Sequence, residues 1–323
     1  MNNKIIHIIM PVVATLLFVV IAGMMMFDDT VGSVSNYNGI VTGWGISPIH
    51  NSMIGVVLNS AIVLLIASLL TYIATHFQLV KEKTLLPLLF FLLFQLLTPA
   101  LVNQFEPTHI LCLVAFTLVG TLYAGYQEKH ATEKGFIIAF ILSTVSLVEA
   151  HILYLLPILV VGIIQIQAAS LRTFAAMVVG LITPYWIIWG LGLVELSQFD
   201  FSTLAIPLQL PTIDARLLPI AVVIMIGLIT GIGNLYNAFN EKIYTRATNG
   251  FINLLSSYIT ILLVIDNAHF IQYLPILNGC VALQACYYFS SHTSRTTSIV
   301  YYTLVTLLIT WVGWIYWGNY PFL

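Results

Sequence analysis

Long apolar stretches, separated by short polar ones, repeat from one end of the chain to the other. Within each stretch the apolar positions are continuous and do not alternate with polar ones, which excludes a transmembrane β-barrel. About 20 apolar residues in a helix cross the roughly 30 Å of hydrocarbon in a bilayer. The pattern therefore predicts an all-α, polytopic transmembrane bundle of about 11 spans. The predicted spans are residues 5–27, 52–75, 84–102, 109–126, 135–149, 151–170, 173–194, 217–237, 250–265, 272–290 and 298–317.

The stretch over residues 135–170 contains one acid and one histidine in an otherwise apolar sequence. Glu149 and His151 are the only acidic or basic side chains between Gly135 and Ala169. If the stretch forms one helix, the pair lies deep in the bilayer, where ionisable groups are costly. If it forms two short helices, the pair lies at the turn between them.

Composition supports a membrane location for the whole chain. Of the 323 residues, 60% are hydrophobic and 7% are charged, and the mean hydropathy is +1.01. Soluble domains carry about 25% charged residues. No linker or charged tail interrupts the pattern, so we predict a single integral membrane domain over residues 1–323. The three cysteines lie in apolar stretches without metal-binding spacing, and we expect them to be packing residues.

The basic residues predict the orientation of the spans, because lysine and arginine collect in short cytoplasmic loops. With a cytoplasmic amino terminus and a hairpin at residues 135–170, nine of the ten basic residues are cytoplasmic and only Arg216 is outside. One long helix would instead leave six inside and four outside. The charges therefore predict the hairpin, with Glu149 and His151 near the outer face and an extracytoplasmic carboxy terminus.

The acidic residues show the opposite distribution. Eight acids and one base then face outward, a formal charge of −7, while four acids and nine bases give +5 inside. Acids follow no strong topology rule. The outer excess therefore indicates a face that handles something cationic or that needs a base.

Three predicted outer turns repeat one pairing of a carboxylate with an imidazole. The pairs are Glu106 with His109, Glu149 with His151, and Asp266 with His269. A carboxylate can orient one nitrogen of an imidazole, which suits proton transfer or metal ligation. The alternative is that these carboxylates cap the helices that follow them. If the three pairs pack together, they converge on one recess.

Two further outer loops carry candidate chemistry. Asp28 and Asp29 directly follow the first span, where adjacent acids could bind a divalent cation or act as a general base, or could form a solvated turn. Arg216 could bind a phosphate bidentately or pair with Asp214. No other cofactor is evident, the metal is unknown, and no nucleotide-binding motif indicates ATP-driven transport.

Polar and small residues inside the spans have two interpretations. The amides are either hydrogen-bonding glue between helices or part of a solute path; they are Asn59, Gln95, Gln165, Asn234, Asn278 and Gln284. The Gly227-x-x-x-Gly231 spacing predicts a close approach of two helices. Tryptophans near the predicted outer ends of two spans suggest an aromatic belt.

Residues 133–190 resemble the central region of an uncharacterised inner-membrane family of Bacteroidota. The shared features are a short helix pair with a polar turn, then Arg172 and a Gly180-x-x-x-Pro184 span. The resemblance implies a bacterial inner-membrane, multi-pass location. More distantly, the chain is similar to the GT-C membrane glycosyltransferases, on the position of Asp28 and Asp29 after the first span. That likeness implies a polyprenyl-phosphate-linked substrate, a catalytic or metal-binding role for these two acids, and a lipid-phosphate contact for Arg216.

These features lead to one functional hypothesis and two alternatives. The hypothesis is an enzyme of envelope biogenesis that acts at the outer face on a lipid-linked or amphiphilic substrate, in the manner of glycosyl transfer. Asp28, Asp29, Glu149 and His151 are its expected catalytic residues, and the expected substrate-binding residues are Glu106, His109, Arg216, Asp266 and His269. The alternatives are a proton-coupled secondary transporter and a non-catalytic scaffold. The lipid bilayer is the expected partner, no nucleic acid is expected, and protein partners are not indicated.

Overall fold

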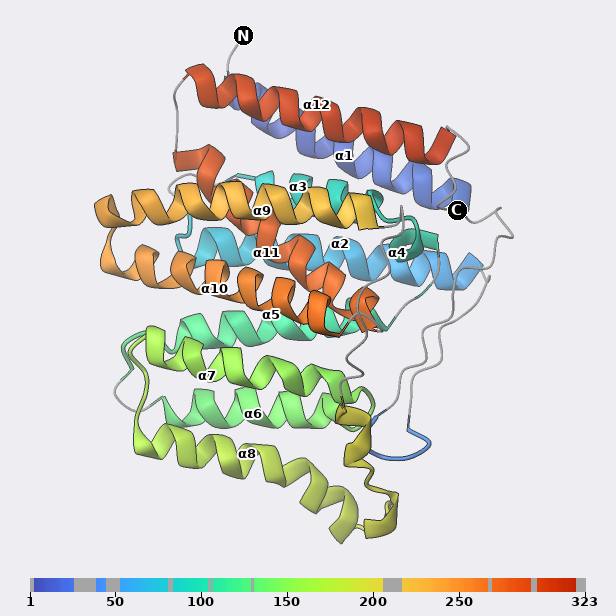
Figure 1. Ribbon diagram of the computed structural model, residues 1–323, viewed down its shortest axis with the longest axis vertical. Helices are drawn as coiled ribbons and strands as arrows, with labels where there is room; N and C mark the ends of the chain where they lie inside the picture. Colours follow the sequence, from blue (N-terminus) through green and yellow to red (C-terminus); the bar gives the residue numbers. More distant parts are fainter. Residues whose placement is uncertain are drawn as a thin grey trace. The chain divides into compact units, whose positions relative to one another are not determined.

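A computed structural model describes residues 3–25, 39–44, 53–80, 84–103, 105, 107–128, 131–205, 217–266, 269–291 and 295–317. These residues are mostly helical and include no strand, only an isolated bridge between Val41 and Phe199 (Figure 1). The α-helices are α1 (Asn3–Met25), α2 (Met53–His76), α3 (Leu86–Leu96), α4 (Ala100–Asn103), α5 (Thr108–Ala124), α6 (Thr132–Ser146), α7 (Leu156–Gln165), α8 (Leu171–Gly190), α9 (Leu217–Asn237), α10 (Ile243–Ile265), α11 (Phe270–Ser291) and α12 (Arg295–Trp317). Short 3₁₀ helices are η1 (Ala150–Leu155), η2 (Leu196–Gln198), η3 (Phe201–Leu204) and η4 (Ala238–Asn240).

Every predicted span contains a helix, and two bounds differ for identifiable reasons. The range 84–102 is not one helix, because α3 ends at Leu96 and α4 begins at Ala100. Pro99 lies in this break; proline lacks the N–H that a helix needs and disfavours helical geometry in the preceding residue. Helix α10 begins at Ile243 rather than near residue 250, since the helix continues beyond its apolar part.

Five helices are long and apolar enough to cross a membrane, namely α2, α8, α9, α10 and α12. By this measure of length and composition the chain is a membrane protein, as predicted. The count of about 11 spans and the orientation of the termini stay predictions.

Helix α8 shows the side-chain arrangement expected in lipid. Its exposed positions are large and apolar, among them Leu171, Val178, Val179, Ile182 and Trp186. Its buried positions include small or polar residues, and they are Thr173, Met177, Gly180, Pro184 and Ile188. In water this pattern would leave a wide apolar face exposed, whereas small residues at helix contacts are typical of membrane bundles.

The chain divides into two compact units. Unit 1 comprises residues 1–33, 48–112 and 210–323, and unit 2 comprises residues 34–47 and 113–209. Both units consist of apolar helices, and the prediction of one membrane domain stays a prediction.

In unit 2 the chain doubles back between α6 and α7, which confirms the predicted hairpin (Figure 1). Glu149 has extended backbone geometry (φ −140°, ψ 102°), so the α-helix cannot continue through it. Helix α6 packs against α8, and the two helices run in the same direction. Gly135 approaches Thr173 near the start of both helices, and further along both helices Ser143 donates a hydrogen bond to the carbonyl of Leu181 (2.6 Å). Two helices that are both neighbours and parallel require a return segment between them, which η1 and α7 provide.

In unit 1 helix α11 has a long buried stretch. Every residue from Gln272 to Tyr287 is buried, and the helix packs against α3, α9 and α10. A Cβ added at Gly227 would lie 2.8 Å from Val281 of α11, so this glycine permits the close helix approach that its spacing predicts. The three cysteines are free and buried, in agreement with a packing role.

Candidate functional site

Five of the nine predicted site residues belong to the described part of the chain. They are His109, Glu149, His151, Asp266 and His269. The other four, Asp28, Asp29, Glu106 and Arg216, lie outside the described residues.

Glu149 and His151 form a buried pair at the turn of the unit 2 hairpin. Glu149 is 2% exposed and His151 is 5% exposed. Oε1 of Glu149 lies 2.7 Å from Nδ1 of His151 and also accepts the backbone N–H of His151 at 3.4 Å. Glu149 therefore both caps η1 and orients the imidazole, so the two interpretations of this pair hold together. Its second oxygen, Oε2, is buried and has no hydrogen-bond partner among the described residues.

Two segments far apart in sequence are joined at the same end of unit 2. Residues 39–44 are bound to the end of α6 by the Ile40 N–H, which donates to the Ser146 carbonyl (3.1 Å). They are bound to residues 198–200 by the Asp200 N–H, which donates to the Ile40 carbonyl (2.8 Å). Gly39 is required here, because an added Cβ would lie 1.9 Å from the carbonyl oxygen of Leu147.

The segment beyond α8 is also attached to the hairpin turn. The Tyr154 hydroxyl donates to the Leu204 carbonyl. Hydrogen bonds from the side chain and backbone of Ser202 lower the pKa of Asp200, which caps η3. The buried pair therefore lies at an end of unit 2 where several loop segments are fixed by hydrogen bonds.

Asp266 and His269 form the second pair, at the turn between α10 and α11 in unit 1. Asp266 is fully buried, and its Oδ1 lies 2.8 Å from Nδ1 of His269. Its Oδ2 accepts a hydrogen bond from the Tyr273 hydroxyl at 2.8 Å. The His269 side chain is 26% exposed, so it connects the buried carboxylate with the surface of the unit.

Both carboxylates contact Nδ1 of their histidine, and this has a chemical consequence. An ionised carboxylate favours a proton on the nitrogen that faces it. In a neutral imidazole, Nε2 is then the basic nitrogen. Each pair can thus take up a proton on Nε2 while the carboxylate stabilises the resulting imidazolium.

His109 lies in the first turn of α5 and is fully buried. Its predicted partner, Glu106, lies outside the described residues, so this pair stays a prediction. The convergence of the three pairs on one recess also stays a prediction, since Glu149 and His151 belong to unit 2 and the other described members to unit 1.

Several buried amides form hydrogen bonds between helices of unit 1, which agrees with the first of the two interpretations drawn from the sequence. Asn59 donates to the Leu101 carbonyl at 2.9 Å and ties α2 to α4. Gln284 of α11 donates to Oδ1 of Asn253 (3.0 Å), and Asn234 donates to the carbonyl of Gln284 (3.1 Å). Sequence reasoning did not include Asn253 in this network or Tyr273 in the Asp266 pair. Tyr273 follows His269 by four residues, a spacing that places both on one face of a helix.

Three amides behave differently. Gln95 of α3 and Gln272 and Asn278 of α11 are buried, and neither side-chain polar atom of each has a hydrogen-bond partner in the described ranges. Gln272 was not among the amides singled out from the sequence.

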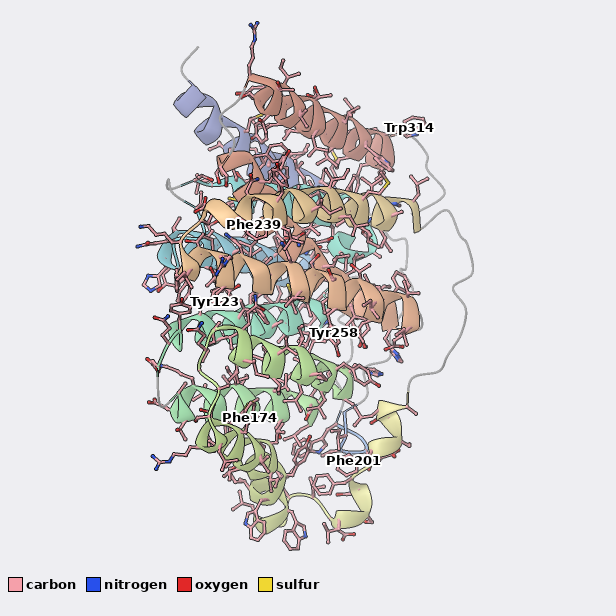
Figure 2. The ribbon with its side chains drawn as sticks, turned by 60° about the vertical axis from the view of Figure 1, so that its left-hand side comes forward. Tyr123, Phe174, Phe201, Phe239, Tyr258 and Trp314 are labelled. Atoms are coloured by element: carbon pink, nitrogen blue, oxygen red, sulfur yellow. The ribbon has the colours of Figure 1, made fainter. Side chains whose placement is uncertain are left out.

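Tryptophans near the ends of α8 and α12 are exposed rather than gathered in a cavity. The exposed ones are Trp186, Trp189, Trp314 and Trp317. Figure 2 shows Trp314 projecting outward from α12. Exposure on apolar helices fits anchoring in a bilayer interface.

The fold and these side chains define a helical membrane protein with two buried carboxylate–imidazole pairs. Comparisons with protein-family models, curated proteins and solved structures found no match to the chain. The resemblances drawn from the sequence therefore stay predictions, and the site itself has to carry the functional argument.

Proposed function

We propose that the protein is a proton-coupled secondary transporter of a bacterial inner membrane. The proposal rests on Asp266, a fully buried carboxylate that contacts a partly exposed histidine. Ionisable groups inside membrane bundles are costly and are usually retained for function. His269 can exchange protons at the surface of the unit, and Asp266 can receive them through the 2.8 Å contact.

The contacts that occupy both oxygens of Asp266 favour transport over catalysis for this pair. A catalytic base must touch its substrate, whereas a proton needs only a hydrogen-bonded route. Both oxygens of Asp266 are already occupied, one by His269 and one by Tyr273. Transfer of a proton from His269 to the carboxylate would neutralise both groups and weaken their contact, which gives a physical link between proton uptake and rearrangement at the α10–α11 turn.

The proposal includes the topology predicted from the charges: about 11 spans, a cytoplasmic amino terminus and an extracytoplasmic carboxy terminus. In that topology the turns at Glu149 and Asp266 face outward, so protons would enter from the extracytoplasmic side, down the gradient that bacterial inner membranes maintain.

Uptake by proteoliposomes tests the function. The purified protein is reconstituted, supplied with a mixture of amino acids, sugars and polyols, and given an acidic exterior; the vesicle contents are then analysed by mass spectrometry. We expect a solute to accumulate only with the pH gradient, and Asp266→Asn to abolish accumulation. Glu128→Gln, which changes an exposed acid, should have no effect. Absence of gradient-driven accumulation by the unaltered protein would overturn the proposal.

A second candidate is the enzyme acting on a lipid-linked substrate, and the geometry of Glu149 favours it. Oε2 of Glu149 has no partner in the described part of the chain while Oε1 holds His151, so one oxygen remains for a general-base role. In this function Asp28 and Asp29 would bind a divalent cation and Arg216 would bind the lipid phosphate.

Incubation with a polyprenyl-phosphate-linked sugar and a hydroxyl-bearing acceptor tests this candidate; the sugar moves from the phosphate to the acceptor hydroxyl, and Glu149 would accept the proton of that hydroxyl. We expect release of the lipid phosphate that requires Mg²⁺, is lost with EDTA and is lost in Glu149→Gln, while Asp266→Asn retains it. If neither assay shows activity, and alanine at Glu149 and Asp28 has no phenotype in cells, the scaffold function is supported instead.

A further inference from the structure

Gln95 and Asn278, two of the amides without partners in the described ranges, lie on neighbouring antiparallel helices of unit 1. Thr84, before α3, contacts Cys286 of α11 at 3.9 Å. At the other end, Leu101 of α4 packs against Leu274 of α11. Gln95 and Asn278 both lie between these two contacts, at about the same level along the helix pair. Asn278 follows Leu274 by four residues, so it lies on the side of α11 that faces α3 and α4.

At this level α3 ends, and α11 lacks one of its backbone hydrogen bonds. Gln95 is the second-to-last residue of α3, before the break at Pro99. On α11, Pro275 lacks an N–H, so the carbonyl of Ile271 loses its helical partner. A helix that ends within the membrane and a proline within a helix both leave polar backbone groups without helical partners, and broken helices are common at the binding sites of transporters.

Gln95 and Asn278 are polar, and the helices that contain them carry no charged side chain. Gln95 is fully buried and Asn278 is 1% exposed, and among the described residues no partner is found for either amide nitrogen or either amide oxygen. Helices α3, α4 and α11 contain no lysine, arginine, aspartate or glutamate. Buried amides are normally satisfied, and one that lacks partners needs a ligand or water to compensate it.

We propose that Gln95 and Asn278 form the solute-binding site of the transporter and that the solute is small, neutral and able both to donate and to accept hydrogen bonds. Two amides offer donors and acceptors together, so a cation would satisfy only their oxygens and an anion only their nitrogens. A polyol or a carboxamide complements both. This inference rests on the proposed transport function and assigns it a substrate class.

The buried amides that tie helices together provide a matched comparison. Gln284 lies on the same helix as Asn278 and is similarly buried, but it donates to Asn253. Replacing an amide that holds helices together should destabilise the fold. Replacing an amide that has no protein partner by an apolar side chain of similar shape should be neutral or stabilising.

Two measurements on Gln95→Met, Asn278→Leu and Gln284→Met test the site. The first is thermal unfolding in detergent, where we expect Gln284→Met to lower the midpoint and the other two to leave it unchanged or raised. The second is equilibrium exchange of radiolabelled glycerol, erythritol and acetamide across proteoliposomes without a pH gradient. We expect the unaltered protein to exchange at least one of these probes and both Gln95→Met and Asn278→Leu to reduce its exchange at least tenfold.

The outcomes separate this site from the coupling function. Asp266→Asn should retain exchange and lose only gradient-driven accumulation. If exchange occurs but no gradient drives accumulation, the site is supported and the proton coupling is wrong. If Gln95→Met and Asn278→Leu destabilise the protein as much as Gln284→Met, or leave exchange intact, or if none of the probes exchanges, the proposed site is wrong.

Discussion

Asp266 and Glu149 are buried carboxylates that each contact Nδ1 of a histidine, but they differ in whether their second oxygen has a hydrogen-bond partner. Both oxygens of Asp266 are occupied, by His269 and by Tyr273. Glu149 keeps one oxygen without a partner among the described residues. Asp266 is therefore suited to storing and passing a proton, and Glu149 to accepting one from a bound molecule.

Tyr273→Phe should destabilise unit 1, because it leaves a carboxylate oxygen of Asp266 buried without its hydroxyl donor. A buried acceptor that loses its donor costs about 1–3 kcal/mol, and more when it is charged. We expect the midpoint of thermal unfolding in detergent to fall. Tyr236→Phe provides the control, since that side chain is 82% exposed. Equal midpoints for the two variants would show that the hydroxyl of Tyr273 contributes nothing to holding Asp266.

The pairing of Glu149 with His151 was predictable at this scale, whereas the role of Tyr273 was not. Residues two or three apart at a turn are neighbours in almost any local structure, so their sequence separation suffices. The partner of an amide such as Gln284 lies on another helix, and helix-to-helix contacts depend on rotation and register that apolar stretches do not specify. For the same reason, the sequence alone did not decide whether Asn59 and Gln95 form hydrogen bonds between helices or line a solute path.

At the scale of elements, the packing of α6 against α8 depends on small residues. A Cβ added at Gly180 would lie 2.6 Å from the carbonyl oxygen of Phe136 and 3.1 Å from Cβ of Ala139. The two helices can approach this closely only because position 180 has no side chain. In lipid, such close packing replaces the hydrophobic driving force that helices have in water.

Gly180→Ala should therefore separate α6 from α8 and destabilise unit 2. Inserting a methyl group into a tight contact costs about 1–3 kcal/mol. Gly190→Ala, at the end of the same helix, is the matched control, because the nearest atom to its added Cβ is 4.0 Å away. We expect a lower unfolding midpoint for Gly180→Ala and an unchanged or higher one for Gly190→Ala. A midpoint for Gly180→Ala equal to that of the unaltered protein would mean that the contact relaxes without cost.

The existence of the helices was predictable from apolar stretches, but the effect of the two prolines near the proposed site was only partly predictable. Pro99 and Pro275 are evident in the sequence, yet a proline inside an apolar stretch is compatible with a continuous kinked helix. In α11 the helix does continue through Pro275, whereas α3 ends before Pro99. The helix breaks at Thr98 and Pro99, because Pro99 cannot donate a backbone hydrogen bond and disfavours helical geometry at Thr98.

At the scale of the whole molecule, the strongest sequence inference is the distribution of charge. Nine of ten basic residues fall on one predicted side only when residues 135–170 double back. The turn between α6 and α7 agrees with that condition. A long-range property of the loops thus predicted a local break that the apolar stretch itself concealed.

The side of the membrane on which each loop lies can be measured directly with two exposed positions in unit 2. Glu128 follows α5 and Ser197 lies in η2 beyond α8, and both side chains are exposed. The predicted topology places residue 128 in the cytoplasm and residue 197 outside. If α6 and α7 crossed the bilayer together as one span, both residues would instead lie on the same side.

Ser197→Cys should therefore react with a membrane-impermeant maleimide in intact cells, and Glu128→Cys should react only after permeabilisation. The native cysteines should not interfere, because all three are buried. Labelling of Glu128→Cys alone in intact cells would reverse the orientation on which the outward-facing proton entry depends, and the same labelling result for both variants would contradict the hairpin topology.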